Sequence, residues 1–233
     1  RTLLTAVREE AAGRDLRRFL SEGVAEAVTD AEDEVVAGRA EARDAAILML
    51  DIRGFTGFSG SHAPDEVVDL LTSFHARAVP RIRVEGGVVD KFLGDGVMAT
   101  FGAVSPSPTA ARDALTALEA VMTEAARWSE ETGTGLVVNG AVAAGPVVFA
   151  ALGHANRLEF TVIGEAVNLA AKLEKHNKTE STRALTTAAC FDRARAEGFA
   201  AARPPERLAE RGVDGVSLFA FRCLLLLRCL LRR

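Results

Sequence analysis

Apolar runs and helical patterns alternate along the first half of the chain. The run "DAAILMLDI", residues 44–52, has the length and the near-continuous apolar character of a strand buried on both faces. From Pro64 onward the apolar residues recur at helical spacing, and Pro80 predicts a kink. The positions expected to face inward are Val67, Val68, Leu70, Leu71, Phe74, Ala78, Val79 and Ile82. These patterns predict a strand followed by a helix that packs on the sheet.

The pattern continues with a hairpin, a second helix and more strands. "GGVVDKFLGDGVMATFG", residues 86–102, predicts two short strands around the tight turn "LGDG", where glycines allow unusual backbone angles. A helix is expected from about 108 to 132, followed by the strands "LVVNGAVAAG", "PVVFAAL" and "RLEFTVI". Another helix opens after Gly164, and a smaller mixed segment ends in the strand "GVSLFAF". This order is that of an α/β domain.

The two ends of the chain differ from its middle. Residues 1–42 are helical in pattern and highly charged, which predicts a connector, whereas residues 43–222 form the expected domain. The tail 223–233, "CLLLLRCLLRR", is apolar and basic, but it is shorter than the ~20 residues of a spanning helix. It is interpreted as a surface for a membrane or partner, as a helical appendage, or as residues foreign to the domain.

Composition excludes several classes of protein. Hydrophobic residues make up 48% and charged residues 26%, with a formal charge of −4, so a nucleic-acid partner is not expected. The three cysteines support neither a disulfide scaffold nor a zinc site, and the expected location is the cytoplasm. The chain begins at Arg1, which suggests a piece of a longer protein and leaves open an upstream sensor, a membrane domain or a membrane tether. The histidines have no ligand spacing and are given no role: His62, His75, His154 and His176.

Two acids stand where an apolar strand gives way to glycine. Asp51 and Asp95 can meet at one sheet edge, because neighbouring strands lie only ~4.8 Å apart. Magnesium binds through one or two carboxylates and substrate phosphates, so the pair suits a nucleotide-metal site. The loop "RGFTGF" adds backbone amides for phosphate, with Phe55 and Phe58 as walls against water. Taken singly, each acid could instead be an ordinary turn residue.

Three long motifs, "LDIRGFTGFS", "GGVVDKFLGDGVMATFG" and "FTVIGEAVNLAAKLE", together resemble the catalytic domain of the class III nucleotide cyclases. The resemblance covers roughly residues 43–221. It implies a ferredoxin-like sheet with helices on one face, and conversion of a nucleoside triphosphate to the 3′,5′-cyclic monophosphate and pyrophosphate. It also implies a head-to-tail homodimer, in which the aspartates come from one chain and the remaining site residues from the other.

The resemblance assigns roles residue by residue. Asp51, Asp95 and the backbone carbonyl of Ile52 would hold two Mg²⁺ or Mn²⁺ ions, and amides near Gly54, Phe55 and Thr56 would complete the phosphate shell.

For the base, Lys91 and Thr161 match the selecting positions. A lysine donates to N1 of adenine and a threonine accepts from its amino group, so ATP is the expected substrate. The threonine is similar to a subgroup with bicarbonate-responsive members, although it does not itself show such a response. Asn168 matches the asparagine that orients the ribose.

Three positions depart from the family's pattern. Lys172 replaces the arginine that stabilises the transition state, and it lacks the bidentate fork. Val213 stands where a lysine touches the triphosphate, with Arg211 as a substitute candidate, and Glu165 replaces an aspartate. The expected enzyme is an adenylate cyclase, a phosphorus-oxygen lyase of signal transduction. The alternatives are a catalytically weak nucleotide-binding or dimerisation module and a guanylate cyclase. A diguanylate cyclase is disfavoured, because the hairpin lacks a "GG[DE]EF" loop.

Overall fold

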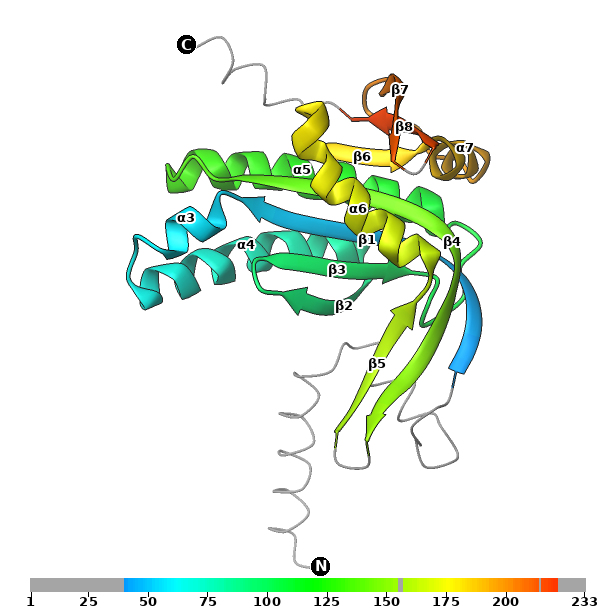
Figure 1. Cartoon of the computed structure of the whole chain (residues 1–233), viewed down its shortest axis with the longest axis horizontal. Coiled ribbons are helices and arrows are strands. Elements are labelled where there is room, and N and C mark those ends of the chain that lie inside the picture. Colours follow the sequence, from blue (N-terminus) through cyan, green and yellow to red (C-terminus); the bar gives the residue numbers. More distant parts are fainter. Residues whose placement is uncertain (1–39, 155–156, 214, 222–233) are drawn as a thin grey trace, which may run out of the picture.

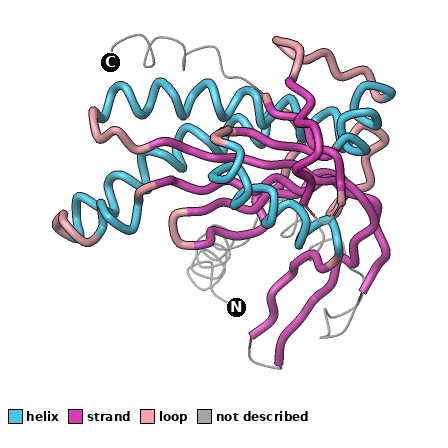
Figure 2. Tube along the Cα trace, turned by 45° about the horizontal axis from the view of Figure 1, so that its top comes forward, coloured by secondary structure: helices cyan, strands magenta, loops and turns pink. Residues whose placement is uncertain are grey.

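A computed structural model of the chain describes residues 40–154, 157–213 and 215–221, and these form one mixed sheet with helices on both faces (Figures 1 and 2). The strands are β1 (Ala40–Arg53), β2 (Val88–Leu93), β3 (Gly96–Phe101), β4 (Val137–His154), β5 (Arg157–Ile163), β6 (Ala184–Thr187), β7 (Glu206–Val213) and β8 (Val216–Ala220). The helices are α3 (Phe55–Ser59), α4 (Pro64–Val84), α5 (Ala110–Thr132), α6 (Glu165–Glu180) and α7 (Ala188–Ala196). The strand order is β2-β3-β1-β4-β6-β8-β7, and β5 pairs with β4 off this path.

The central strand β1 separates two apolar cores. Its residues Ala46, Leu48, Leu50 and Ile52 face the core that α4 and α5 cover. The alternate residues Ala45, Ile47 and Met49 face a second core, which includes Ala170 and Leu173 of α6. Because successive strand residues point to opposite faces, an uninterrupted apolar run is what a strand between two helix layers requires. The expectation of helices on one face was therefore wrong, since α6 covers the opposite face from α4 and α5 (Figure 1).

The hairpin and the helices confirm the pattern of the sequence, with local corrections. The two strands predicted after α5 are one strand, β4, which pairs with β1 from Val137 to Ala150 and continues beside β5 (Figure 1). Helix α4 continues through Pro80 without a break. Val68 was expected to face inward, but it is 60% exposed, because Leu70, Phe74, Ala78 and Ile82 define the buried stripe. Part of the expected glycine loop is the short helix α3.

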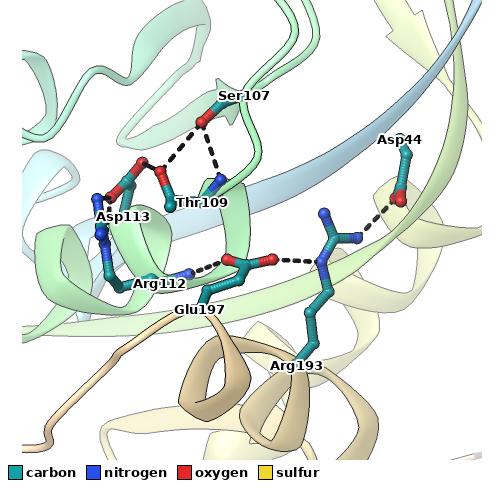
Figure 3. Close-up of polar contacts among 7 residues, drawn as sticks. All are labelled: Asp44, Ser107, Thr109, Arg112, Asp113, Arg193 and Glu197. Atoms are coloured by element: carbon teal, nitrogen blue, oxygen red, sulfur yellow. Dashed lines mark hydrogen bonds and ion pairs between the residues drawn. The ribbon is translucent and has the colours of Figure 1, made fainter.

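A polar network fastens the sheet to two helices near the start of β1 (Figure 3). We call it the Asp44 network, and its members are Asp44, Ser107, Thr109, Arg112, Asp113, Arg193 and Glu197. Arg193 donates to Asp44 Oδ1 and to Glu197 Oε1, each at 2.7 Å. Glu197 also accepts from the backbone N–H of Arg112 at 2.8 Å, at the start of α5. Each carboxylate of this network thus receives a donor.

Both ends of the chain fall outside the described residues. The predicted connector lies there up to residue 39, and β1 begins at Ala40. The tail 223–233 lies there as well. Within the described ranges, every helix is too short or too polar to cross a membrane.

Candidate active site

Two carboxylates meet where β1 ends beside the β2–β3 turn. Leu50 of β1 pairs with Val97, which places Asp51 next to the turn that carries Asp95. The turn approaches closely: a Cβ atom on Gly96 would lie 2.9 Å from the carbonyl oxygen of Leu50. Only glycine permits this approach, because real Cβ contacts essentially never fall below 3.0 Å. The structure therefore brings together the two acids that the sequence singled out.

Asp51 is held in an environment that disfavours its charge. Burial raises the pKa of Asp51, and the charge of Asp95 and a side-chain hydrogen bond to Asp95 raise it further. The charges of Arg53 and Lys175 act in the opposite direction. Two carboxylates in this arrangement share a proton or require a cation between them. The described residues contain no group of three or more His, Cys, Asp or Glu side chains that could hold a metal ion. Mg²⁺ usually binds through one or two carboxylates and takes its other ligands from phosphate oxygens and water, so two carboxylates are enough to hold it.

A row of polar side chains continues from Asp51 across the sheet. Asp51 pairs with Asn139 of β4, which is 1% exposed, and the backbone N–H of Gly140 donates to the carbonyl of Arg183 at 2.7 Å. Arg183 Nη1 donates to Asn139 Oδ1 at 3.3 Å. In the other orientation of its amide, Asn139 accepts from Arg53 Nε at 3.0 Å and from Arg53 Nη2. These two sets of bonds are alternatives, because they use opposite orientations of the amide, but both guanidinium groups lie beside Asn139 and near Asp51.

The two arginines repel one another. Burial lowers the pKa of Arg183, and the charge of Arg53 lowers it further. In the part of the chain that the structure describes, neither guanidinium forms an ion pair with a carboxylate. Such a pair of cations is suited to an anion with several oxygens, because each guanidinium presents a planar fork of donors.

Helix α6 covers this row of polar side chains on the face of the sheet opposite α4 and α5. Its buried Glu174 has a raised pKa, first because of burial and then because of the charge of Asp51, and a hydrogen bond to Asn139 opposes the shift. Asn177 donates to the carbonyl of Gly140 at 3.0 Å and so fixes the helix against β4. The row therefore belongs to the packed core and not to a loose surface loop.

The glycine loop after β1 forms α3 and packs on the core. Gly54 has φ 87°, a left-handed conformation, and its carbonyl accepts from Gly57 and Phe58 at 3.1 Å each. The amides of Phe55 and Thr56 lie in the first turn, where backbone N–H groups have no partner within the helix. Phe55 and Phe58 are half-buried against the core that α4 and α5 cover. The amides expected to bind phosphate are therefore at the start of a short helix.

The side chains of Lys91 and Thr161 both approach the carboxylate of Asp90. Lys91 Nζ lies 2.5 Å from Glu159 Oε1 and 3.5 Å from Asp90 Oδ2. The hydroxyl of Thr161 donates to the same Asp90 Oδ2 at 3.2 Å. The two expected base-selecting residues, from β2 and β5, thus share one carboxylate.

The other expected residues lie on α6 and β7. Asn168 and Lys172 are exposed and stand one helical turn apart, on the same face of α6. Asp51, in contrast, faces Glu174 and Lys175, and Lys175 lies about 10 Å along the helix axis from Asn168. Arg211 is in β7, but its side chain lies outside the described residues, whereas Val213 pairs with Val216.

Residues 39–199 match the family described as the adenylate and guanylate cyclase catalytic domain. The chain belongs to this family. The match covers most of the chain and includes the hairpin, the carboxylate pair and α6.

Known cyclases of both substrate classes are similar to this domain. It is 32% identical over 158 residues to an adenylate cyclase of Anabaena cylindrica, which covers 66% of the chain and 32% of that protein. It is 35% identical over 196 residues to the uncharacterized protein Rv1318c of Mycobacterium tuberculosis, covering 84% of the chain and 35% of that protein. The solved structure of the guanylyl cyclase Cya2 superposes with a TM-score of 0.65 at 24% identity, covering 79% of the chain and 93% of Cya2. The chain thus spans about a third of the length of these curated relatives.

Three polar residues of the cyclase domain were missed by the sequence analysis: Arg53, Asp90 and Arg183. Arg53 could have been found, because it lies two residues after Asp51 and strand periodicity places both on one face. Arg183 could not have been found, because only the parallel pairing of β4 with β6 brings it to Asn139. Asp90 had a local signal, its place beside Lys91, but its bond to Thr161 depends on the packing of β5 against β2.

Proposed function

We propose that the domain is an adenylate cyclase, which converts ATP to 3′,5′-cyclic AMP and pyrophosphate in a head-to-tail homodimer. The observation that carries the proposal is the Asp51–Asp95 carboxylate pair, in which burial and mutual repulsion raise the pKa of Asp51. A structural pair of this kind would be unfavourable, whereas a cation site gains from it.

The carboxylates and the carbonyl of Ile52 would hold two Mg²⁺ or Mn²⁺ ions. When bound, these ions lower the pKa of the ribose 3′-hydroxyl and neutralise the triphosphate. Asp51 and Asp95 fix the position of that positive charge at the end of β1. The 3′-hydroxyl would give its proton to water and its oxygen would attack the α-phosphorus in line, while the bond from the α-phosphorus to the bridging oxygen breaks and pyrophosphate leaves.

The triphosphate would be held by cations and amides on the same side of the sheet. Arg53 and Arg183 lie beside Asp51 without a close ion pair to a carboxylate in the described ranges, and anionic oxygens would relieve their repulsion. The backbone amides near Gly54, Phe55 and Thr56 add donors at the start of α3. The arginines would take over the role of the family's triphosphate-binding lysine, whose position Val213 occupies in this chain.

A second copy of the chain would complete the site. Asn168 and Lys172 lie towards the start of α6, whereas Asp51 faces Glu174 and Lys175 further along the same helix. A partner could bring its own Asn168 and Lys172 to Asp51, with Lys91 and Thr161 for the base. Large apolar residues are exposed by 40–51% on β2, β4 and β5, which offers a surface for that partner: Phe92, Leu93, Val148, Leu152 and Ile163.

A catalytically weak nucleotide-binding module is the alternative, because Lys172 replaces an arginine of the family without its bidentate fork and Val213 replaces a lysine. Measuring cyclic AMP, cyclic GMP and pyrophosphate from the purified protein with Mg²⁺ or Mn²⁺ separates the candidates. Cyclic AMP with stoichiometric pyrophosphate is expected. Nucleotide binding without any cyclic product would leave the weak module, and a predominance of cyclic GMP would indicate a guanylate cyclase.

Mixing two inactive variants tests the shared site. A heterodimer of Asp51→Asn and Asn168→Ala chains contains one site with all its groups intact. If chains exchange freely, half of the dimers are mixed, so about a quarter of wild-type activity is expected in the mixture. Heterodimers that form but stay inactive would show that each site lies within one chain.

A further inference from the structure

Asp90 occupies an irregular position in β2. Val89 pairs with Ala99 and Lys91 pairs with Met98, so Asp90 is the extra residue of a β-bulge. In a regular strand, adjacent side chains point to opposite faces. Here the side chains of Asp90 and Lys91 approach to 3.5 Å instead, since bulges re-aim side chains.

The re-aimed carboxylate is buried and has two partners. Only 6% of the Asp90 side chain is exposed, and its Oδ2 atom receives the Thr161 hydroxyl at 3.2 Å and faces Lys91 Nζ at 3.5 Å. Burial raises the pKa of Asp90, while Lys91 and the hydrogen bond from Thr161 oppose that shift. A buried carboxylate is costly unless it is hydrogen-bonded, so the contacts with Thr161 and Lys91 are what stabilise Asp90 in this position.

The direction of the Thr161 bond determines what the hydroxyl can do elsewhere. A threonine hydroxyl has one hydrogen to donate and two lone pairs with which to accept. An ionised carboxylate only accepts, so the hydrogen of Thr161 points at Asp90. Towards any other group, Thr161 is then an acceptor only.

We infer that Asp90 is a specificity-determining positioning residue: it holds Thr161 as a hydrogen-bond acceptor and so makes the base site select a 6-aminopurine. The inference rests on the proposed function, in which Thr161 faces the purine. Adenine carries an amino donor at position 6, and guanine carries a carbonyl acceptor there. An acceptor-only Thr161 pairs with the amino group and leaves the guanine carbonyl facing another lone pair. Unpaired polar groups of this kind are a strong source of discrimination.

Asp90→Asn tests this inference with almost no change in shape. The amide can donate to Thr161 Oγ1, which releases the hydroxyl hydrogen to turn towards a carbonyl. We expect the ratio of kcat/KM for ATP over GTP to fall by about tenfold, the value of roughly one hydrogen bond. Inosine triphosphate, which also has a carbonyl at position 6, should gain relative to ATP in the same way. Asp90→Ala frees the hydroxyl completely and should shift both ratios in the same direction if the Asn variant does not fold.

Glu159→Gln is the matched control. Glu159 also pairs with Lys91, but through Oε1 at 2.5 Å, and Thr161 donates to Asp90 instead. Removing the charge of Glu159 therefore changes the surroundings of Lys91 as Asp90→Asn does, and the ATP to GTP ratio should stay within about twofold of wild type. An equal fall in both variants would show that Lys91 and not Thr161 carries the effect, and would overturn the inference.

A second arm asks whether Asp90 acts through Thr161. In a Thr161→Val background the hydroxyl is gone, so Asp90→Asn should no longer change the ratio. A ratio unchanged by Asp90→Asn in an active enzyme would overturn the inference and leave the proposed cyclase function standing. If the wild-type protein makes no cyclic nucleotide, the proposed function fails and this inference fails with it.

Discussion

Strand β1 carries Asp44 towards its start and Asp51 near its end, and the surroundings of these two acids differ in their electrostatics. At Asp44, carboxylates alternate with guanidinium groups and backbone donors at 2.7–2.8 Å (Figure 3). Seven residues later, roughly 23 Å along the strand, Asp51 faces Asp95 and Glu174, and Arg53 faces Arg183. The first end pairs opposite charges at hydrogen-bond distance. The second end places like charges together, and the charges of Arg53 and Lys175 offset the raised pKa values of Asp51 and Glu174 only in part.

The contrast separates stabilisation from function on a single strand. The Asp44 network needs nothing further and fastens α5 and α7 to the sheet. The Asp51 end has unfavourable contacts that a cation between its acids and an anion between its arginines would both relieve. A metal–nucleotide complex supplies both charges. Such contacts are enriched at functional sites, which supports the proposal that this end of β1 binds a metal–nucleotide complex.

The largest expected difference between the two ends is in catalysis. Asp51→Asn or Asp95→Asn should lower the rate of cyclic AMP formation by roughly 1000-fold, because metal-ion charge is worth several kcal/mol in the transition state. Asp44→Asn is the same chemical change at the other end of β1, and it should leave the rate within about twofold. Comparable activity in the Asp51 and Asp44 variants at saturating Mn²⁺ would contradict the metal assignment.

The arginines should show the second-largest difference. Arg53→Gln or Arg183→Gln should each lower kcat/KM for ATP by roughly 10- to 100-fold, since hydrogen bonds to charged groups are worth about 1.5–3 kcal/mol. Arg193→Gln removes an arginine that already has carboxylate partners. It should leave kcat/KM unchanged and lower the free energy of unfolding by about 0.5–1 kcal/mol. Urea unfolding and steady-state kinetics measure the two quantities. A loss of kcat/KM in Arg193→Gln, with unchanged kcat/KM in Arg53→Gln and Arg183→Gln, would contradict this difference between the two ends of β1.

Lys172 provides a smaller test, at a third cation. Lysine keeps the charge of the usual arginine but not its planar fork, so Lys172→Arg should raise kcat several-fold with little change in KM. Lys172→Ala should lower kcat more than it weakens ATP binding. If kcat is untouched in the alanine variant, the cation of the transition state comes from elsewhere, and Arg211 is the next residue to substitute.

The smallest expected effect is on stability as a function of pH. The pKa of Asp51 is raised in the folded protein, so the folded state binds a proton more tightly than the unfolded chain does. Between the ordinary aspartate pKa and this raised value, the contribution of Asp51 to the free energy of unfolding should fall as pH rises. Asp51→Asn should remove that contribution, so the profile of the variant should be flatter than that of the wild type. Identical slopes in metal-free buffer would show that neither burial nor Asp95 raises the pKa of Asp51 in the folded protein.

The sequence predicted the elements better than their connections. Asp51 and Asp95 were paired correctly because both signals are local: an apolar run that ends in an acid, and a glycine turn. The contact of Arg183 with Asn139 could not be predicted, because it depends on the crossover that places β6 beside β4. The second helix layer was missed for a similar reason. A run such as "AAILML" shows that both faces of a strand are buried, but not which helices cover them. The splitting of β4 into two strands came from Gly145 and Pro146, which the long pairing with β1 overrides.

Strand β4 also connects the two parts of the proposed site, the part beside the phosphates and the part beside the base. It carries Asn139 near one end, and Ala150, eleven residues later, pairs with Thr161. The part of β4 beside the phosphates of one site and the part beside the base of the other would therefore lie at most about 36 Å apart on the same strand. In the proposed head-to-tail pair each chain would contribute one such strand, so this length would limit the distance between the two reaction centres. Inserting two residues into β4 would keep every side chain on its face of the sheet. It would nevertheless move both reaction centres of the proposed homodimer out of register at once, because one strand would set their spacing.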